Sequence, residues 1–239
     1  MGDQDTGGNP GRSAAVAAGI REAVYSGEYV PGQRLVEADL CEQYQASRSV
    51  VRAALQELAS EGLVEVQRHR GARVRKVSHE EAVEITEVRR AVEGLIAAQA
   101  AARAQPEQIA ELRRLGEQMR RAVADLDTLG YSELNARLHG LVRQIAAHRT
   151  AGAIIERLRG QIVRHQVRLA LQPGRSSVSL RQHEKIIEAI AAGDPEAAEA
   201  AMHDHLDDVL HALRQMDQAD GGPRIRRGAM SDGRSWRPA

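Results

Sequence analysis

Hydrophobic residues recur every three or four positions in two short stretches near the start of the chain. This spacing predicts amphipathic helices at 35–44 and 47–58 with a tight break between them, which is a helix-turn-helix arrangement. In the second helix Val51, Leu55 and Leu58 fall on one face, so we expect them to face a core. The exposed first turn, where a recognition helix makes its DNA contacts, holds Ser47, Arg48, Ser49 and Arg52.

The pattern after the second helix changes to an alternation with a period of two. It predicts a strand at 63–67, a turn at 68–71 and a second strand at 72–77. A hairpin directly after a helix-turn-helix makes a winged helix. A basic run is frequently only a solvated surface, but its place beside a recognition helix favours contacts with DNA phosphates. Residues 67–77 include no acid, and the basic residues are Arg68, Arg70, Arg73, Arg75 and Lys76.

The rest of the chain shows helical spacing only, beginning with the capping-box sequence Ser78-His-Glu-Glu81. The sequence therefore predicts a mainly α protein, with an N-terminal winged helix-turn-helix domain at 12–77 and a C-terminal all-α antiparallel bundle of about six helices at 78–218. Residues 1–11 and 219–239 lack such patterning and are expected to be disordered tails. The expected bundle helices span about 78–104, 106–126, 131–147, 150–171, 177–192 and 195–217.

Composition adds few constraints. Lys plus Arg and Asp plus Glu are balanced at 33 each, so the basic character is local to the wing. The basic residues of the C-terminal tail, such as Arg226 and Arg227, are interpreted as part of a solvated segment. The single cysteine, Cys41, lies on the apolar side of its helix and is expected to be a core residue. Because neither a signal peptide nor a membrane span is recognisable, a cytoplasmic protein with no membrane partner is expected.

Histidines are the main chemical feature of the predicted bundle. Asn135 and His139 lie four residues apart and therefore project from one helix face, while His183 and His205 lie on two later helices. Four such groups from three helices can converge on one ion inside a bundle. The spacing alone leaves the question open, because any one of nine histidines is more often a hydrogen-bonded or surface residue than a ligand. His203, two residues before His205, is expected to face solvent.

The N-terminal residues resemble the GntR-type winged-helix regulators, through Pro31-Gly-Gln-Arg-Leu35, Glu37-Ala-Asp-Leu40, Ser47-Arg48 and Glu61-Gly-Leu-Val64. The resemblance implies that Arg48 and Arg52 contact operator bases and backbone, and that Ser47 and Ser49 contact phosphates. It also places Arg70 and Gly71 at the minor groove or its edge, with Arg73 on the wing beside them. Family members usually have Gly-Val where this chain has Gln45-Ala46, so a positive φ there would carry a backbone cost.

The C-terminal residues resemble the FCD effector domain of the FadR branch, through Glu87-Val-Arg-Arg, Leu138-His139, Gln182-His183-Glu-Lys and Gly193-Asp-Pro. Many members of that branch bind a divalent metal through an acid, a histidine four residues later and two further histidines. Carried over, the ligands are Asn135, His139, His183 and His205. An amide is a poorer donor than a carboxylate, so Asn135 should weaken the site, while three imidazoles suit Zn²⁺ or Ni²⁺.

These features together predict a homodimeric regulator that binds an inverted-repeat operator in double-stranded DNA. A three-histidine site leaves coordination positions for a small carboxylate effector, whose other end Arg89 would hold. Pairing of Arg89 with Glu93, four residues later, is an equally open role. We expect repression that the acid relieves, and no enzymatic activity.

Three alternatives remain at this stage. The first is a regulator that senses the divalent metal directly. The second is a three-histidine metalloenzyme fused to a DNA-binding head, against which stands the lack of an acid spaced as a general base. The third is an architectural DNA protein whose bundle is purely structural, which would leave the clustered histidines unexplained.

Overall fold

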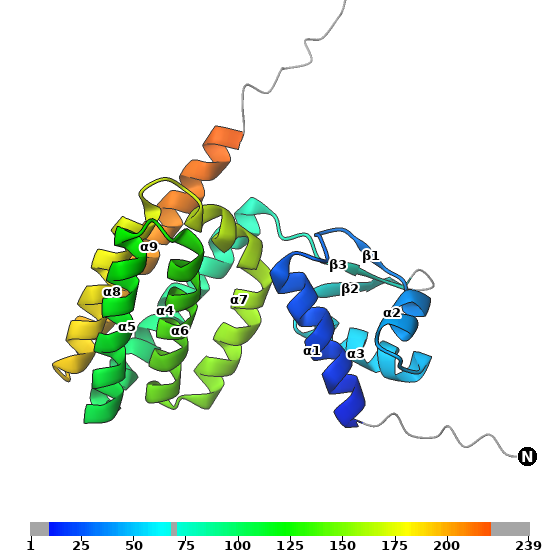
Figure 1. Cartoon of the computed structure of the whole chain (residues 1–239), viewed down its shortest axis with the longest axis horizontal. Helices are drawn as coiled ribbons and strands as arrows, with labels where there is room; N and C mark the ends of the chain where they lie inside the picture. The colour runs from blue at the N-terminus through cyan, green and yellow to red at the C-terminus, as the bar shows by residue number, and fades with distance from the viewer. Residues whose placement is uncertain (1–9, 68–70, 221–239) are drawn as a thin grey trace, which may run out of the picture.

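The computed structural model describes residues 10–67 and 71–220 (Figure 1). Most of the expected tails therefore lie outside the described residues, as does Arg70. Pro10 and Gly11 are helical rather than part of a tail, because α1 (Pro10–Ser26) begins with them. Residues 219 and 220 likewise belong to the last helix, so both terminal helices are longer than the sequence pattern predicted.

The N-terminal domain is a winged helix in which α1 packs across the helix-turn-helix. Its further helices are α2 (Glu37–Gln43) and α3 (Arg48–Ser60). The expected core face of α3 is confirmed, because Val51, Leu55 and Leu58 are buried together with Ile20 of α1. Cys41 is a free thiol packed against this core, as predicted.

The turn between α2 and α3 adopts a backbone that favours glycine. Gln45 has a φ of 47°, which confirms the cost expected from the absence of glycine there. Its carbonyl accepts a hydrogen bond from the Arg12 guanidinium of α1. Ser47 then caps α3, because its hydroxyl accepts from the backbone N–H of Val50 at 3.4 Å.

The wing is an antiparallel sheet with strand order β1-β3-β2, composed of β1 (Arg34–Leu35), β2 (Val64–Gln67) and β3 (Gly71–Val74). The sequence pattern missed β1, because two residues are too short to show an alternation. The strand predicted at 72–77 ends at Val74 instead. Residues 75–77 leave the sheet and form the connection to the bundle.

The C-terminal domain is a bundle of six helices within the described part of the chain, which confirms the predicted all-α architecture. Its central helix is α4 (His79–Arg103), which packs along the last helix and also contacts α6, α7 and α8. Ser78 caps α4 by accepting from the backbone N–H of Glu81 at 3.1 Å, as the capping-box sequence predicted. The others are α5 (Pro106–Ala124), α6 (Thr128–Ala146), α7 (Arg149–Ala170), α8 (Arg175–Ala191) and α9 (Pro195–Asp220).

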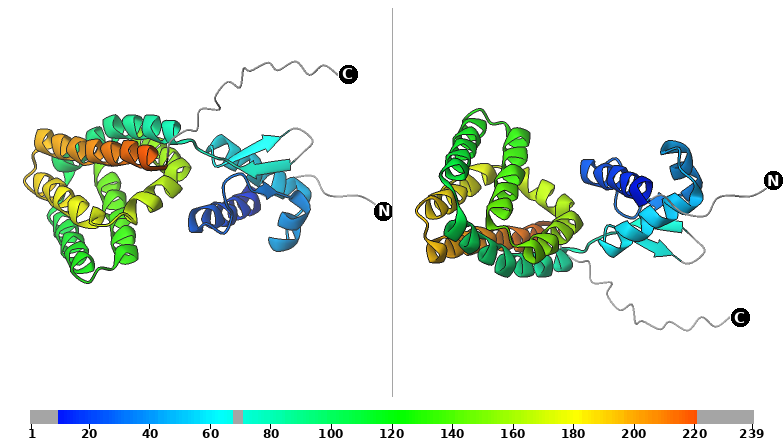
Figure 2. Two further views of the ribbon diagram at one scale, coloured as in Figure 1. Left: turned by 90° about the horizontal axis from the view of Figure 1, so that it is seen from above. Right: turned by 90° about the horizontal axis from the view of Figure 1, so that it is seen from below.

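The head and the bundle lie side by side, joined by the short segment between β3 and α4 (Figure 2). Helix α7 is the bundle helix that meets α1 of the head. No helix in the described ranges is long and apolar enough to cross a membrane.

Candidate metal centre and DNA-binding head

The DNA-binding residues predicted on the recognition helix lie at its exposed N-terminal end. Ser47, Arg48, Ser49 and Arg52 are all exposed in the isolated chain. Ser47 already caps the helix, and its hydroxyl lies 2.9 Å from that of Ser49. Arg52 forms a hydrogen-bonded ion pair with Glu37 at 2.9 Å. Arg48 is the exposed guanidinium at the very start of α3, where a recognition helix reaches base edges.

The basic side chains of the wing point in two different directions. Arg73 is exposed on the central strand β3, where its Cα pairs with that of Arg34 in β1 and with that of Glu65 in β2, so the two cations and one acid share a face of the sheet. Gly71 opens β3 with a φ of 82°. Arg75 instead turns toward the bundle, where Nη1 donates to Gln161 at 3.0 Å and Nη2 pairs with Glu81. In the isolated chain the guanidinium of Arg75 is therefore held at the junction of the domains, and it is not free there for the phosphate contact expected of it.

The three histidines singled out in the sequence meet inside the bundle. His139 comes from α6, His183 from α8 and His205 from α9, and all three side chains are buried. One ring nitrogen from each lies within 4.8 Å of the others. The rings of His183 and His205 are nearest, with centroids 4.5 Å apart. This is the geometry of a shared ligand set rather than of separate surface residues.

Each of these imidazoles is held through its Nδ1 atom. Nδ1 of His139 lies 3.0 Å from Oε2 of Glu93, and Nδ1 of His205 lies 3.0 Å from Oε1 of Gln182. Because a carboxylate and an amide oxygen can only accept, both Nδ1 atoms carry the proton. Nδ1 of His183 lies 3.0 Å from the hydroxyl of Tyr131. The Nε2 lone pairs of His139 and His205 are therefore left for a metal, which is the arrangement that orients histidine ligands in metalloproteins. The Tyr131 hydroxyl can donate or accept, so it is compatible with the same tautomer of His183.

Two unpartnered buried atoms fit a bound cation. Nε2 of His183 and Oδ1 of Asn135 are both buried and make no hydrogen bond with any described residue. Asn135 lines the same cavity as His139 and His205, one helical turn before His139. A buried polar atom without a partner is costly, and a divalent ion would satisfy the Asn135 oxygen and, with the proton of His183 on Nδ1, the Nε2 atom of that histidine. The residues present thus suit a nitrogen-rich site for Zn²⁺ or Ni²⁺.

The electrostatics keep these histidines neutral. Burial lowers the pKa of His183 and of His205 well below the usual imidazole value, and the neighbouring imidazole of His139 adds to this. Burial also lowers the pKa of His139, although Glu93 opposes it. Burial alone would raise the pKa of Glu93, but the Arg89 guanidinium and His139 outweigh it and hold that pKa well below its usual range. Neutral imidazoles are the form that binds metals.

Arg89 contacts the carboxylate of Glu93 and also lines the cavity beside the histidines. Its Nε donates to Oε1 of Glu93 at 2.8 Å, so the i+4 pairing is present, although it is buried rather than at the surface. Nη1 of Arg89 is buried without a hydrogen-bond partner in the described ranges. The guanidinium lines a cavity of about 200 Å³ together with His139 and His205. The two roles considered for Arg89 are thus compatible.

Two further arginines of the cavity escaped sequence reasoning. Arg159 on α7 lines it, and burial lowers the pKa of that guanidinium. Arg175, at the start of α8, also lines it and pairs with Asp208 of α9, while its Nη2 is buried and unpartnered among the described residues. Neither arginine belongs to a motif. Only the packing of α7 and α8 brings them to the cavity. The roles of Glu93, Gln182 and Tyr131 as hydrogen-bond partners of the histidines also escaped sequence reasoning.

His203 does not face solvent as expected. It is half-buried against Gly94 of α4, and its Nε2 atom makes no hydrogen bond with the described residues and lies 3.9 Å from Oε1 of Glu199. Helix α9 packs along α4, so a residue two positions from His205 is covered by α4 rather than left outside. His203 is not part of the cluster that His205 joins.

Comparisons with known proteins agree with this division of the chain. Residues 12–74 match the family "Bacterial regulatory proteins, gntR family", and residues 84–208 match the FCD domain. The HTH-type transcriptional repressor RspR of Escherichia coli is 30% identical over 188 residues, which cover 79% of this chain and 82% of that protein. A probable D-xylose utilization operon transcriptional repressor of Paenarthrobacter nicotinovorans is 29% identical, over 82% of this chain and 88% of its own length.

Solved structures show the same fold. Escherichia coli McbR/YncC superposes with a TM-score of 0.73 at 22% identity, over 86% of this chain and 98% of that one. A GntR regulator from Rhodococcus sp. RHA1 superposes with a TM-score of 0.66 at 24% identity, over 86% of this chain and 98% of its own. The named relatives regulate transcription and are not enzymes, which sets aside the metalloenzyme alternative. The chain is therefore a member of the GntR family of DNA-binding transcriptional regulators, with an FCD domain as its C-terminal half.

Proposed function

We propose that this regulator is a homodimeric repressor that a small organic acid releases from its operator by binding at a divalent metal in the FCD bundle. The observation that carries the proposal is the convergence of three buried imidazoles beside a cavity that Arg89, Arg159 and Arg175 line. Such a site has the ligands for a cation and the donors for an anion in one place.

The metal would be held by His139, His183 and His205, with the amide oxygen of Asn135 as a weaker fourth ligand. Three protein nitrogens leave coordination positions open, and the ion would supply a Lewis-acidic position for a carboxylate oxygen. The chain's own residues do the rest. Glu93 orients His139, and Gln182 orients His205.

Arginines would bind the remainder of the effector. Arg89 lines the cavity and its Nη1 has no hydrogen-bond partner among the described residues, and a buried guanidinium forms strong charge-assisted hydrogen bonds with a carboxylate. Because Glu93 already neutralises much of the charge of Arg89, we expect Arg159 to supply the larger electrostatic attraction. The volume of about 200 Å³ limits the effector to a compact molecule.

A second copy of the chain would pack along α4. Apolar residues on its outer face follow alternating steps of three and four, the spacing of a coiled-coil seam. Val88 and Leu95 are 50% and 42% exposed, unusually high values for large apolar side chains. Smaller residues at 91, 98 and 102 complete the stripe. Two heads related by a two-fold axis would then match an inverted-repeat operator.

Repression is proposed because the two relatives compared above are both named repressors. An effector can shift the operator equilibrium only by its different affinity for the DNA-bound and free forms. The head and the bundle share a contact surface at α7, so a change in the bundle has a route to the head.

The test uses an operator selected from random-sequence DNA and the metal-loaded full chain. We expect at least one of a panel of small carboxylates to weaken operator binding by the wild type. The His205→Ala variant should bind the operator with normal affinity, and the acid should not change that affinity. Operator affinity that follows Zn²⁺ or Ni²⁺ concentration without any acid would instead establish direct metal sensing. An equal response to the acid in wild type and His205→Ala would refute the proposed site.

A further inference from the structure

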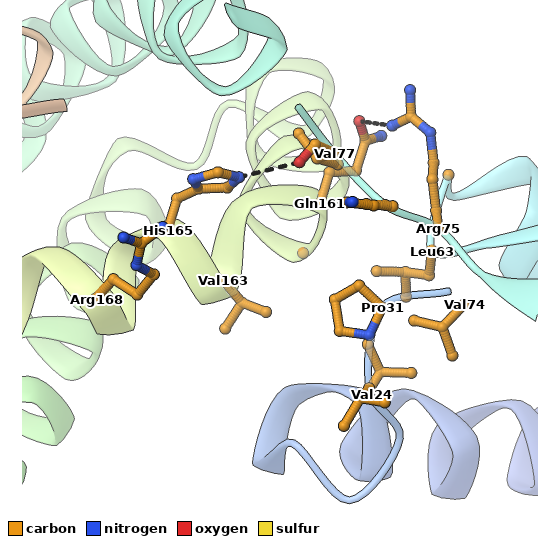
Figure 3. A pocket seen from close by; sticks show the side chains of 14 residues that line it. Val24, Pro31, Leu63, Val74, Arg75, Val77, Gln161, Val163, His165 and Arg168 are labelled. Atoms are coloured by element: carbon orange, nitrogen blue, oxygen red, sulfur yellow. Dashed lines mark hydrogen bonds between the residues drawn. The ribbon is translucent and has the colours of Figure 1, made fainter. Parts of the chain in front are cut away.

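A second cavity, which none of the three clustered histidines lines, lies where the head meets the bundle (Figure 3). Its volume is about 340 Å³, within the range of small-molecule sites, which occur preferentially at domain interfaces. Residues of the head, of the connecting segment and of α7 all line it. It is therefore bounded by both domains, and we call it the junction cleft.

The walls of the junction cleft are mainly apolar. Val24, Pro31 and Leu63 lie on the head side of the opening in Figure 3, and Val163 of α7 lies on the other side. Val30 also lines the cleft and is 46% exposed, a large value for a valine. Such a surface favours a ligand with an apolar body, because burying it removes that surface from water.

The charged residues of the cleft are all of one sign. Arg75, Lys76 and Arg168 line it, and none of its described lining residues is acidic. Arg75 is already paired with Glu81, and His165 contacts the carbonyl of Val77 at 3.2 Å. Lys76 is exposed and offers an ammonium at the edge of the apolar walls. The charge therefore favours an anionic group on the ligand.

We propose that the junction cleft is a second ligand site, which binds a monocarboxylate with an apolar body about the size of an aromatic ring. This ligand differs in class from the compact acid expected at the metal centre. That centre is lined by three arginines and binds its ligand through a metal, whereas the cleft has apolar walls with a basic edge.

A ligand in this cleft would act on the position of the head. Gln161 of α7 donates to the carbonyl of Glu61, the C-cap of the recognition helix, at 3.0 Å and accepts from Arg75 at 3.0 Å. These contacts join the end of α3 to the bundle directly beside the cleft. Val163 lines both the cleft and the metal-site cavity, so occupancy of either affects a shared wall. The ligand would favour whichever arrangement of the two domains preserves the cleft.

Calorimetry on the full chain with three probes tests the chemistry. Phenylacetate has both the apolar body and the charge, phenylacetamide keeps the shape without the charge, and acetate keeps the charge without the body. We expect phenylacetate to bind about tenfold or more tightly than phenylacetamide, as loss of a charge-assisted contact implies. Acetate should not compete with it. Equal binding of the amide, or no binding of phenylacetate at millimolar concentration, would overturn the proposal.

Three variants locate the site. Val30→Glu places a negative charge in the cleft, where it would repel the carboxylate of phenylacetate. The affinity for phenylacetate should fall at least about tenfold. Val66→Glu is its matched control, because Val66 is 45% exposed on the same domain but lies outside the cleft. His205→Ala disables the metal centre and should leave phenylacetate binding intact. Loss of phenylacetate binding in His205→Ala, or equal losses of affinity in the two valine variants, would contradict the assignment. Neither result depends on whether the metal centre controls DNA binding.

Discussion

Nδ1 of His139 lies 3.0 Å from Oε2 of Glu93, whose other oxygen accepts from Nε of Arg89 at 2.8 Å. One buried carboxylate thus connects an imidazole of the proposed metal site with a guanidinium that lines the cavity. An anion that draws Arg89 toward the cavity would also act on the residue that orients His139. The proposed cation and anion sites would therefore be coupled through Glu93.

Replacing Glu93 with Gln should lower the metal affinity about ten- to hundredfold, because carboxylate partners of ligating histidines contribute on that scale. The variant keeps the size of the side chain but removes the charge. Competition with a chromophoric chelator measures the effect. Glu87→Gln is the control on the same helix, since Glu87 is exposed and paired only with Arg214 in the described contacts. A metal affinity unchanged by Glu93→Gln would remove Glu93 from the account.

Asn135→Asp should raise the metal affinity, because it adds an anionic ligand of nearly the same shape to a proposed site whose other ligands are neutral. The buried Oδ1 atom without a donor marks the position where the charge would be placed. The same charge should weaken an anionic effector in the cavity. Titration of metal and then of acids into both proteins separates the two effects. A metal affinity that stays constant or falls would mean that Asn135 is not a ligand.

The metal-free bundle should lose stability as the pH falls below about 6.5, the value for an unperturbed histidine. Below it the unfolded chain takes up protons, whereas burial holds the folded-state pKa of His139, His183 and His205 lower. Each such histidine contributes a slope of at most about 1.4 kcal/mol per pH unit.

Urea denaturation between pH 7.5 and 5.5 measures this slope. His183→Leu should reduce the slope of the unfolding free energy against pH by the contribution of one histidine. His211→Leu is the matched control, because His211 is exposed on α9. A slope that is the same for wild type and His183→Leu would show that His183 is not held neutral in the folded bundle.

Arg48→Ala should weaken specific operator binding by about 1–3 kcal/mol and relax base preference, because a bidentate arginine contact discriminates between bases. Arg73→Ala should instead weaken operator and random DNA alike and flatten the salt dependence, as loss of a phosphate contact does. Fluorescence anisotropy at several salt concentrations compares both DNA classes. Equal losses on both classes for Arg48→Ala would refute its role as a base reader.

The sequence predicted most of the architecture because helical spacing, caps and turn residues are local signals. The recognition helix and the six bundle helices are where their patterns placed them, within a few residues. Asn135 and His139 could be placed on one face for the same reason. Strand β1 escaped, since Leu35 was assigned to a helix and two residues show no period.

Long-range packing decided what the sequence could not. Arg75 is indistinguishable from Arg73 in a basic alternating run, and only the position of α7 turns it to Gln161. The Arg89–Glu93 pair has the spacing of a surface pair, and it is buried because neighbouring helices cover that side of α4. Arg159 became a site residue for the same reason.

The metal content of purified protein tests the central claim most directly. Elemental analysis of the wild type should find about one divalent ion per chain, since one set of ligands is present. His139→Ala, His183→Ala and His205→Ala should each lose most of it, while His211→Ala retains it. Full metal retention in all three cluster variants, or a wild type that binds no Zn²⁺ or Ni²⁺ when either is supplied, would contradict the account.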